Sequence, residues 1–292
     1  MRFGLLGPLT VTCDDGGSVD LRGRKIRILT AMLLCRANQP VAVEPLVDAL
    51  WGLAPPKQAR ASLRVYVHHL RQALGEARID RGPGGYQLLV RPDELDVDRF
   101  RALAATGRDA RSRQDPAGAS AAFRAALALW RGPALAGFTG VDGLTAAAYG
   151  LDELRLDVLE QRFDAELALG RHGEISPELR ALSRQYPLRE SLQAQLMRVL
   201  AARGLGAEAV AVFDETRRRL ADELGLDPGP QLRELHLSIL RSEQPATPGE
   251  PVEVSAPAVS VVDVVPRQLP AQTTGFTGRA DQLRQLDALL AA

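Results

Sequence analysis

Aromatic residues make up only 4% of this 292-residue chain, which also has just four histidines and two cysteines. A core with so few aromatic side chains must be built largely from Leu and Ala, which favours close-packed helices. Cys13 and Cys35 stand in no metal-type spacing, and two isolated thiols suit a reducing compartment better than a disulfide scaffold. No apolar run approaches the roughly 18 residues of a membrane span, so we expect a cytoplasmic protein with no membrane partner.

The chain also has no net charge, with 36 Lys/Arg against 36 Asp/Glu. The balance is nevertheless uneven, because residues 1–92 hold 13 basic and 7 acidic side chains and the remainder hold 23 and 29. A basic first part joined to an acidic second part predicts that only the first part binds a polyanion. The length suits two domains, and we place their boundary after residue 92.

Strand patterns, helical patterns and a hairpin follow one another in residues 1–92. Residues 2–13 alternate as two short strands, and after a turn Val19 and Leu21 are expected to begin a third. Helices are predicted over 24–37, 44–51 and 56–74, and a glycine-rich hairpin at 82–85 follows. This order predicts a winged helix-turn-helix domain. The buried stripe of its first helix is predicted to contain Ile28, Ala31, Met32 and Cys35.

The third predicted helix has a buried stripe, formed by Leu63, Val67, Leu70 and Leu74, and a polar face opposite to it. No acidic residue occurs between positions 57 and 72. Polar side chains can read base edges in a major groove while cations hold phosphates. An ordinary solvated helix face is the alternative, but the cationic hairpin that follows, with Arg78 before its tip, favours DNA. The candidate DNA-binding residues are Lys57, Arg60, Arg64, Val65, His68, His69, Arg71, Gln72 and Arg81.

Other chemistry finds little support in the sequence. Adjacent residues such as His68 and His69 point about 100° apart on a helix, so chelation of a metal by this pair is not expected. No Ser/His/Asp or Cys/His arrangement has a supporting context, and paired carboxylates fall on helices, where they usually form a solvated face. We therefore expect no catalysis, no cofactor and no metal.

From Leu95 onward the patterns are helical throughout. Apolar residues recur at i, i+4 and i+7 in three places, as in the second helix of a tetratricopeptide repeat, and the last two sets are 34 residues apart with Pro187 between them. Stacked helix pairs leave a concave face for a partner, so the alternative function is a protein-interaction scaffold that uses the winged helix as another protein surface. Residues 131–147 are predicted to form a loop insertion. The three sets are Ala119, Phe123 and Ala126; Ile175, Leu179 and Leu182; and Ala209, Phe213 and Thr216.

At this point a family resemblance becomes specific. Residues 1–92 resemble the OmpR/PhoB-type winged helix of the Streptomyces antibiotic regulatory protein family, and residues 93–242 resemble that family's bacterial transcriptional activator domain. We therefore expect a mainly α fold with a small β component. The matching segments are residues 3–9 (FGLLGPL), 46–52 (LVDALWG), 65–75 (VYVHHLRQALG), 85–88 (GYQL), 96–100 (DVDRF), 128–135 (ALWRGPAL) and 220–230 (LADELGLDPGP).

The resemblance implies a transcriptional activator that binds direct repeats in double-stranded DNA upstream of antibiotic biosynthesis genes. It also implies contact with the RNA polymerase holoenzyme, including its sigma factor, a homodimer on the DNA and a nucleoid-associated location. It places Val65, His69 and Arg71 where an OmpR-type helix contacts bases, and the pair His68-His69 departs from the basic or small polar residues frequent there.

The remaining residues predict a different kind of segment. Residues 243–274 are rich in proline and read as an extended linker. Residues 275–292 resemble the start of the nucleotide-binding ATPase domain of larger family members. The chain stops before any phosphate-binding loop, so we expect a truncated domain there.

Overall fold

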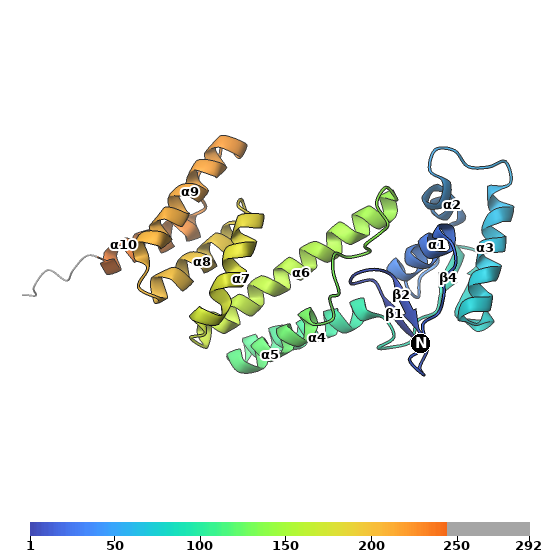
Figure 1. Cartoon of the computed structure of the whole chain (residues 1–292), viewed down its shortest axis with the longest axis horizontal. Helices are drawn as coiled ribbons and strands as arrows, with labels where there is room; N and C mark the ends of the chain where they lie inside the picture. Colours follow the sequence, from blue (N-terminus) through green and yellow to red (C-terminus); the bar gives the residue numbers. More distant parts are fainter. Residues whose placement is uncertain (244–292) are drawn as a thin grey trace, which may run out of the picture. The chain divides into compact units, whose positions relative to one another are not determined.

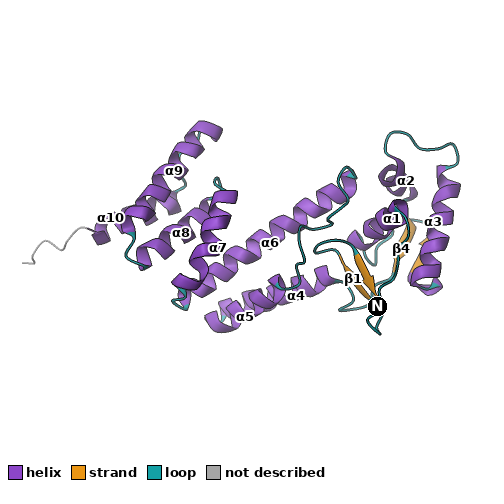
Figure 2. Cartoon of the chain, viewed as in Figure 1, coloured by secondary structure: helices purple, strands orange, loops and turns teal. Residues whose placement is uncertain are grey.

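The computed structural model describes residues 1–243 (Figures 1 and 2). The predicted linker and ATPase-like segment lie outside the described residues, apart from residue 243, which ends the last helix. None of the described helices is long and apolar enough to cross a membrane. The strands are β1 (Arg2–Gly4), β2 (Thr10–Thr12), β3 (Ile79–Gly82) and β4 (Gly85–Leu88). The helices are α1 (Arg24–Cys35), α2 (Val43–Trp51), α3 (Ala59–Leu74), α4 (Asp96–Ser112), α5 (Pro116–Leu127), α6 (Asp142–Ala168), α7 (His172–Gln185), α8 (Glu190–Ala202), α9 (Gly206–Leu224) and α10 (Pro230–Glu243), with a short 3-10 helix at Glu76–Arg78.

Two antiparallel hairpins form the β component, β1 with β2 and β3 with β4. The expected third strand at Val19 and Leu21 is wrong. The structure has only a single bridge between Thr12 and Ser18. Residues 19–22 form no strand, and the chain then turns through Gly23, at a positive φ of 92°, directly into α1.

The three predicted helices of the first domain are present, with two corrections. Helix α3 begins at Ala59 rather than residue 56, because Pro56 to Ala59 form a turn in which the Ala59 N–H donates to the Pro56 carbonyl at 2.9 Å and Gln58 has non-helical dihedral angles. Cys35 is exposed, whereas Leu33 and Leu34 are buried. Helix α1 packs against α2, α3, β4 and α6, so it buries a face wider than one stripe.

Consecutive helices from α4 to α10 pack against one another, which confirms the mainly α fold with a small β part (Figure 2). The three tetratricopeptide-like sets lie on α5, α7 and α9, and all their residues but the half-buried Leu182 are buried. The insertion predicted over 131–147 is too long. Glycines at positive φ interrupt the chain only as far as Gly140, and residues 142–147 already form the first turns of α6.

The described residues form two hydrophobic cores. The first combines side chains from both sides of position 92, including Phe3, Leu46 and Phe100. The second core lies among α6–α10 and includes Phe163 and Leu192. Because α6 contributes to both cores, the winged helix and the helical stack are joined by packing as well as by the chain.

Candidate nucleic-acid interface

Helix α3 presents the face expected of a DNA-reading helix. Leu63, Val67, Leu70 and Leu74 are all buried, as the spacing predicts, and they fix the helix on α1 and α2. On the opposite face His68, His69 and Gln72 are exposed, and the apolar Val65 is 51% exposed. An apolar side chain held in water beside polar tips suits contact with base edges and thymine methyl groups.

The candidate cations are not equally free. Lys57, Arg64 and Arg81 are exposed, and within residues 1–243 none of the three forms a salt bridge. Lys57 lies in the turn that precedes α3, not on the helix itself. Arg60 is exposed too, but its Nη2 lies 2.6 Å from Oε1 of Glu44 on α2. Sequence reasoning missed this acid because it considered only the acids of the third helix.

Arg71 is engaged inside the protein. Its Nε and Nη2 atoms both donate hydrogen bonds to the backbone carbonyl of Ile79, at 3.1 and 3.0 Å. The side chain is half-buried. Arg71 therefore ties the end of the candidate recognition helix to the first residue of β3. The base contact that the family resemblance implies stays a prediction.

The wing is the hairpin formed by β3 and β4, with Arg81 opposite Tyr86. Its return strand is fixed to the segment before α2, since the backbones of Tyr86 and Val41 exchange hydrogen bonds of 2.8 and 3.0 Å. Gly85 is required at this contact. Its φ is +123°, and a Cβ there would lie 2.0 Å from the Val41 carbonyl oxygen. The Arg81 guanidinium, 5.8 Å from the ring centre of Tyr86, is thus held next to the start of α2.

A cleft of about 340 Å³ separates the wing from α2 and α3. Arg60, Arg64 and Arg81 are among the residues that line it. Glu44, in the first turn of α2, is the acidic residue in this lining. The arrangement favours a bound anion, since arginines are well suited to phosphate oxygens.

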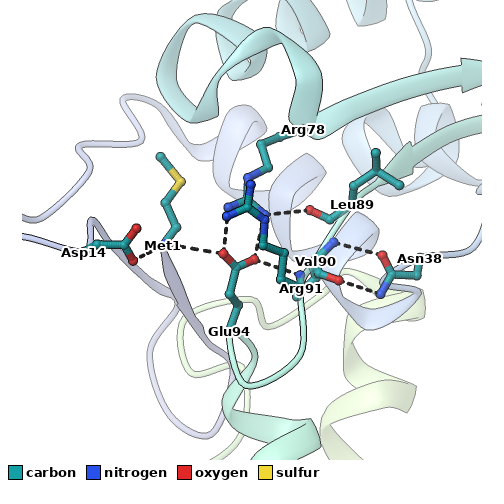
Figure 3. Close-up of polar contacts among 8 residues, drawn as sticks. All are labelled: Met1, Asp14, Asn38, Arg78, Leu89, Val90, Arg91 and Glu94. Carbon is teal, nitrogen blue, oxygen red and sulfur yellow. Dashed lines mark hydrogen bonds and ion pairs between the residues drawn. The ribbon is translucent and has the colours of Figure 1, made fainter.

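Arg78, expected to add charge beside the wing, is not available to DNA (Figure 3). Its Nη1 and Nη2 atoms bind the two carboxylate oxygens of Glu94 at 2.6 and 2.7 Å, and its side chain is only 15% exposed. The hydrogen bonds from Arg78 are the main cause that lowers the pKa of Glu94 to about 2. Nearby, the Asn38 side chain bonds to both the N–H and the carbonyl of Val90. These contacts stabilise the segment that follows β4, between the wing and α4.

Within residues 1–243 no group of three or more His, Cys, Asp or Glu side chains is positioned to hold an ion. The rings of His68 and His69 are 6.1 Å apart and tilted. Both histidines therefore belong to the exposed face of α3.

A winged helix with a cationic, exposed third helix, joined to a helical stack, defines the class of DNA-binding transcriptional regulators. Comparison with known families agrees. Residues 16–87 match the family described as transcriptional regulatory protein, C terminal, and residues 95–240 match the bacterial transcriptional activator domain.

Individual relatives carry regulatory names. Over the whole length of this chain, the identity to the regulatory protein AfsR of Streptomyces coelicolor is 41%, and the chain spans 29% of the length of AfsR. It is 38% identical to the regulatory protein DnrI of Streptomyces peucetius, over 83% of this chain and 93% of that one. The solved structure of Mycobacterium tuberculosis EmbR with a low-affinity phosphopeptide superposes with a TM-score of 0.79 at 36% identity, covering 82% of this chain and 65% of that one. The chain belongs to the Streptomyces antibiotic regulatory protein family.

Proposed function

We propose that this protein is a transcriptional activator that binds direct repeats in double-stranded DNA upstream of secondary-metabolite biosynthesis genes. The observation that carries the proposal is the exposed face of α3, which carries Val65, His68 and His69 together with Arg64, a cation that forms no salt bridge within residues 1–243. Lys57, in the turn before the helix, is a second such cation. Helix α3 enters the major groove, and Arg81 on the wing contacts the adjacent backbone or minor groove. No catalytic step, cofactor or metal is part of the proposal.

The helical stack, in this proposal, contacts the RNA polymerase holoenzyme, including its sigma factor, while two copies lie side by side on the repeats. The match of residues 95–240 to an activator domain supports this assignment. The protein acts in the cytoplasm, on the nucleoid.

Fluorescence anisotropy with duplexes from the protein's own gene neighbourhood tests the proposal. We expect tight binding to direct repeats spaced by one helical turn, about 10–10.5 base pairs. Affinity should fall steeply as salt rises, because each neutralised phosphate releases counterions. Repeats moved apart by half a turn should bind much more weakly. Binding that is weak, insensitive to salt and without sequence preference would contradict the proposal.

That contrary result would favour a protein-interaction scaffold. A cleft of about 380 Å³ between α7, α8 and α9 provides the specific observation for this second candidate. It combines apolar walls at Leu196 and Val212 with charged rims at Arg180 and Glu215. A partner should then bind the helical stack with an affinity that duplex DNA does not change.

A further inference from the structure

The cleft between the wing, α2 and α3 contains a carboxylate where a DNA-binding surface would be expected to avoid one. Glu44 faces the same cavity as Arg60, Arg64 and Arg81. Within residues 1–243 Arg64 and Arg81 form no salt bridge, whereas Arg60 is held by Glu44 at 2.6 Å. One of the three arginines is therefore already occupied before any ligand arrives.

The pair between Arg60 and Glu44 is of a kind that exchanges easily. The Arg60 side chain is 75% exposed and the Glu44 side chain 64% exposed. Exposed ion pairs contribute only about 0–1 kcal/mol to stability, because water screens them. A phosphate in the same cleft would gain charge-assisted hydrogen bonds from two or three guanidinium groups at once.

The cleft is shaped in advance rather than formed on binding. The wing is fixed to the segment before α2 by the paired hydrogen bonds between Val41 and Tyr86. The start of α3 is fixed by the buried Leu63, which also lines the cleft. Glu44 thus stays close to any anion bound there, unless its side chain rotates away.

We propose that this cleft receives one backbone phosphate of the DNA and that Glu44 competes with this phosphate for Arg60. The inference rests on the proposed function and identifies Glu44 as a residue that sets the affinity of the protein for DNA. If Glu44 keeps Arg60, the phosphate lacks that guanidinium, and if the phosphate takes Arg60, the ion pair with Glu44 is lost. Either way Glu44 lowers the affinity, and it does so equally for all sequences because a phosphate carries no sequence information.

The test compares Glu44→Gln with Glu76→Gln. Both substitutions remove one negative charge from the winged helix, but Glu76 is exposed at the far end of α3, outside the cleft. Anisotropy titrations over a salt series use a direct-repeat duplex and a scrambled duplex of equal length. We expect Glu44→Gln to bind both duplexes roughly 3–10-fold more tightly, with a salt slope steeper by up to about 0.9. Glu76→Gln should stay within about twofold of the unmodified protein, because screening weakens distant charges.

A double variant completes the design. Compared with Arg60→Gln alone, the double variant Glu44→Gln/Arg60→Gln should show no gain in affinity, and circular dichroism melts should confirm that every variant is folded. A Glu44→Gln protein that binds like Glu76→Gln, or a gain that survives loss of Arg60, overturns the inference while leaving the proposed function intact. If the unmodified protein shows no salt-sensitive binding to either duplex, the proposed function fails and the inference fails with it.

Discussion

The Glu94 carboxylate holds together the strand that leaves the wing and the start of the helical stack. It accepts two hydrogen bonds from the Arg78 guanidinium and one of 2.8 Å from the backbone N–H of Arg91. Its backbone carbonyl accepts from the N–H of Phe3 at 2.7 Å. With only 11% of its side chain exposed, the ion pair is poorly screened. The hydrogen bonds to its carboxylate, chiefly those from Arg78, stabilise the charged form and lower the pKa of Glu94 from the usual 4.5 to about 2.

This pKa predicts how stability depends on pH. A carboxyl whose pKa is lowered by folding contributes stability above its unfolded pKa, and that contribution is lost as the pH falls through the folded value. We expect the free energy of unfolding of the unmodified protein to exceed that of the Glu94→Gln variant by about 2–3 kcal/mol at pH 6. The difference should shrink between pH 4.5 and about 2. Urea denaturation at a series of pH values measures it, and a difference that stays constant down to pH 2.5 would contradict the prediction.

Between elements, Arg71 connects α3 to β3. Its two hydrogen bonds to the Ile79 carbonyl use the donors that a bidentate contact to guanine would need. We expect Arg71→Ala to lower the free energy of unfolding by about 1–2 kcal/mol. The affinity of Arg71→Ala should fall by the same factor for the operator and for mismatched duplexes. The substitution removes a contact that positions the wing, not a contact to a base.

Arg64→Ala is the matched control for this prediction. Arg64 is exposed on the same helix and makes no salt bridge within residues 1–243, so its loss should weaken all duplexes equally without lowering stability. Chemical denaturation and anisotropy with single-mismatch duplexes measure both quantities. An Arg71→Ala protein of unchanged stability that loses about 1–3 kcal/mol of discrimination at one base pair would instead support the family's base contact.

The sequence predicted the individual elements well because each has its own periodicity. The stripe from Leu63 to Leu74 fixed the orientation of α3, and the buried sets around Phe123 and Phe213 placed α5 and α9. Errors arose where local rules compete. A turn closed by Ala59 and Pro56 precedes α3, so the helix begins later than its pattern predicts. Before α6, the glycines at positive φ end at Gly140, and no residue type after it marks where the helix begins.

Contacts between elements were beyond the reach of these patterns. Periodicity shows which face of a helix is exposed but not which side chain of another element stands opposite. The pairs of Arg60 with Glu44 and of Arg78 with Glu94 each span 16 residues and cross from one element to another. For this reason the candidate cations could be named from the sequence, but those already occupied within the protein could not be separated from those free to bind DNA.

In the molecule as a whole, the winged helix and the helical stack contact each other through segments that match the family's motifs. The segment around Leu5 and Leu6, from the first motif, pairs with Arg131 and Leu135, from the motif after α5. The backbone N–H of Arg131 donates to the Leu6 carbonyl at 2.8 Å, and that of Leu135 donates to the Leu5 carbonyl at 2.9 Å. Together with the core shared across position 92, this pairing fixes the direction of the winged helix relative to α4–α6.

Asp96 lies at the centre of this joint. Its carboxylate accepts hydrogen bonds from the backbone N–H groups of Leu5 and Leu6 at 2.9 and 3.1 Å, and from Nη2 of Arg131 at 2.9 Å. Nη1 of Arg131 in turn donates to Oγ1 of Thr10 at 2.9 Å. A side chain from the first residue of α4 therefore satisfies backbone groups just after β1, which would otherwise lack partners.

We expect Asp96→Asn to loosen this joint. The amide keeps the shape of the carboxylate but loses its charge and offers one acceptor fewer, so the free energy of unfolding should fall by about 1–3 kcal/mol. Asp98→Asn on the same helix is the control, because Asp98 is mostly exposed and lies 3.8 Å from Arg101, and its loss should cost less than about 0.5 kcal/mol. On DNA, Asp96→Asn should keep its affinity for one half-site but lose preference for repeats one turn apart, since a loosely held winged helix adapts to other spacings. Equal behaviour of the two variants in denaturation and in anisotropy would show that packing alone orients the winged helix.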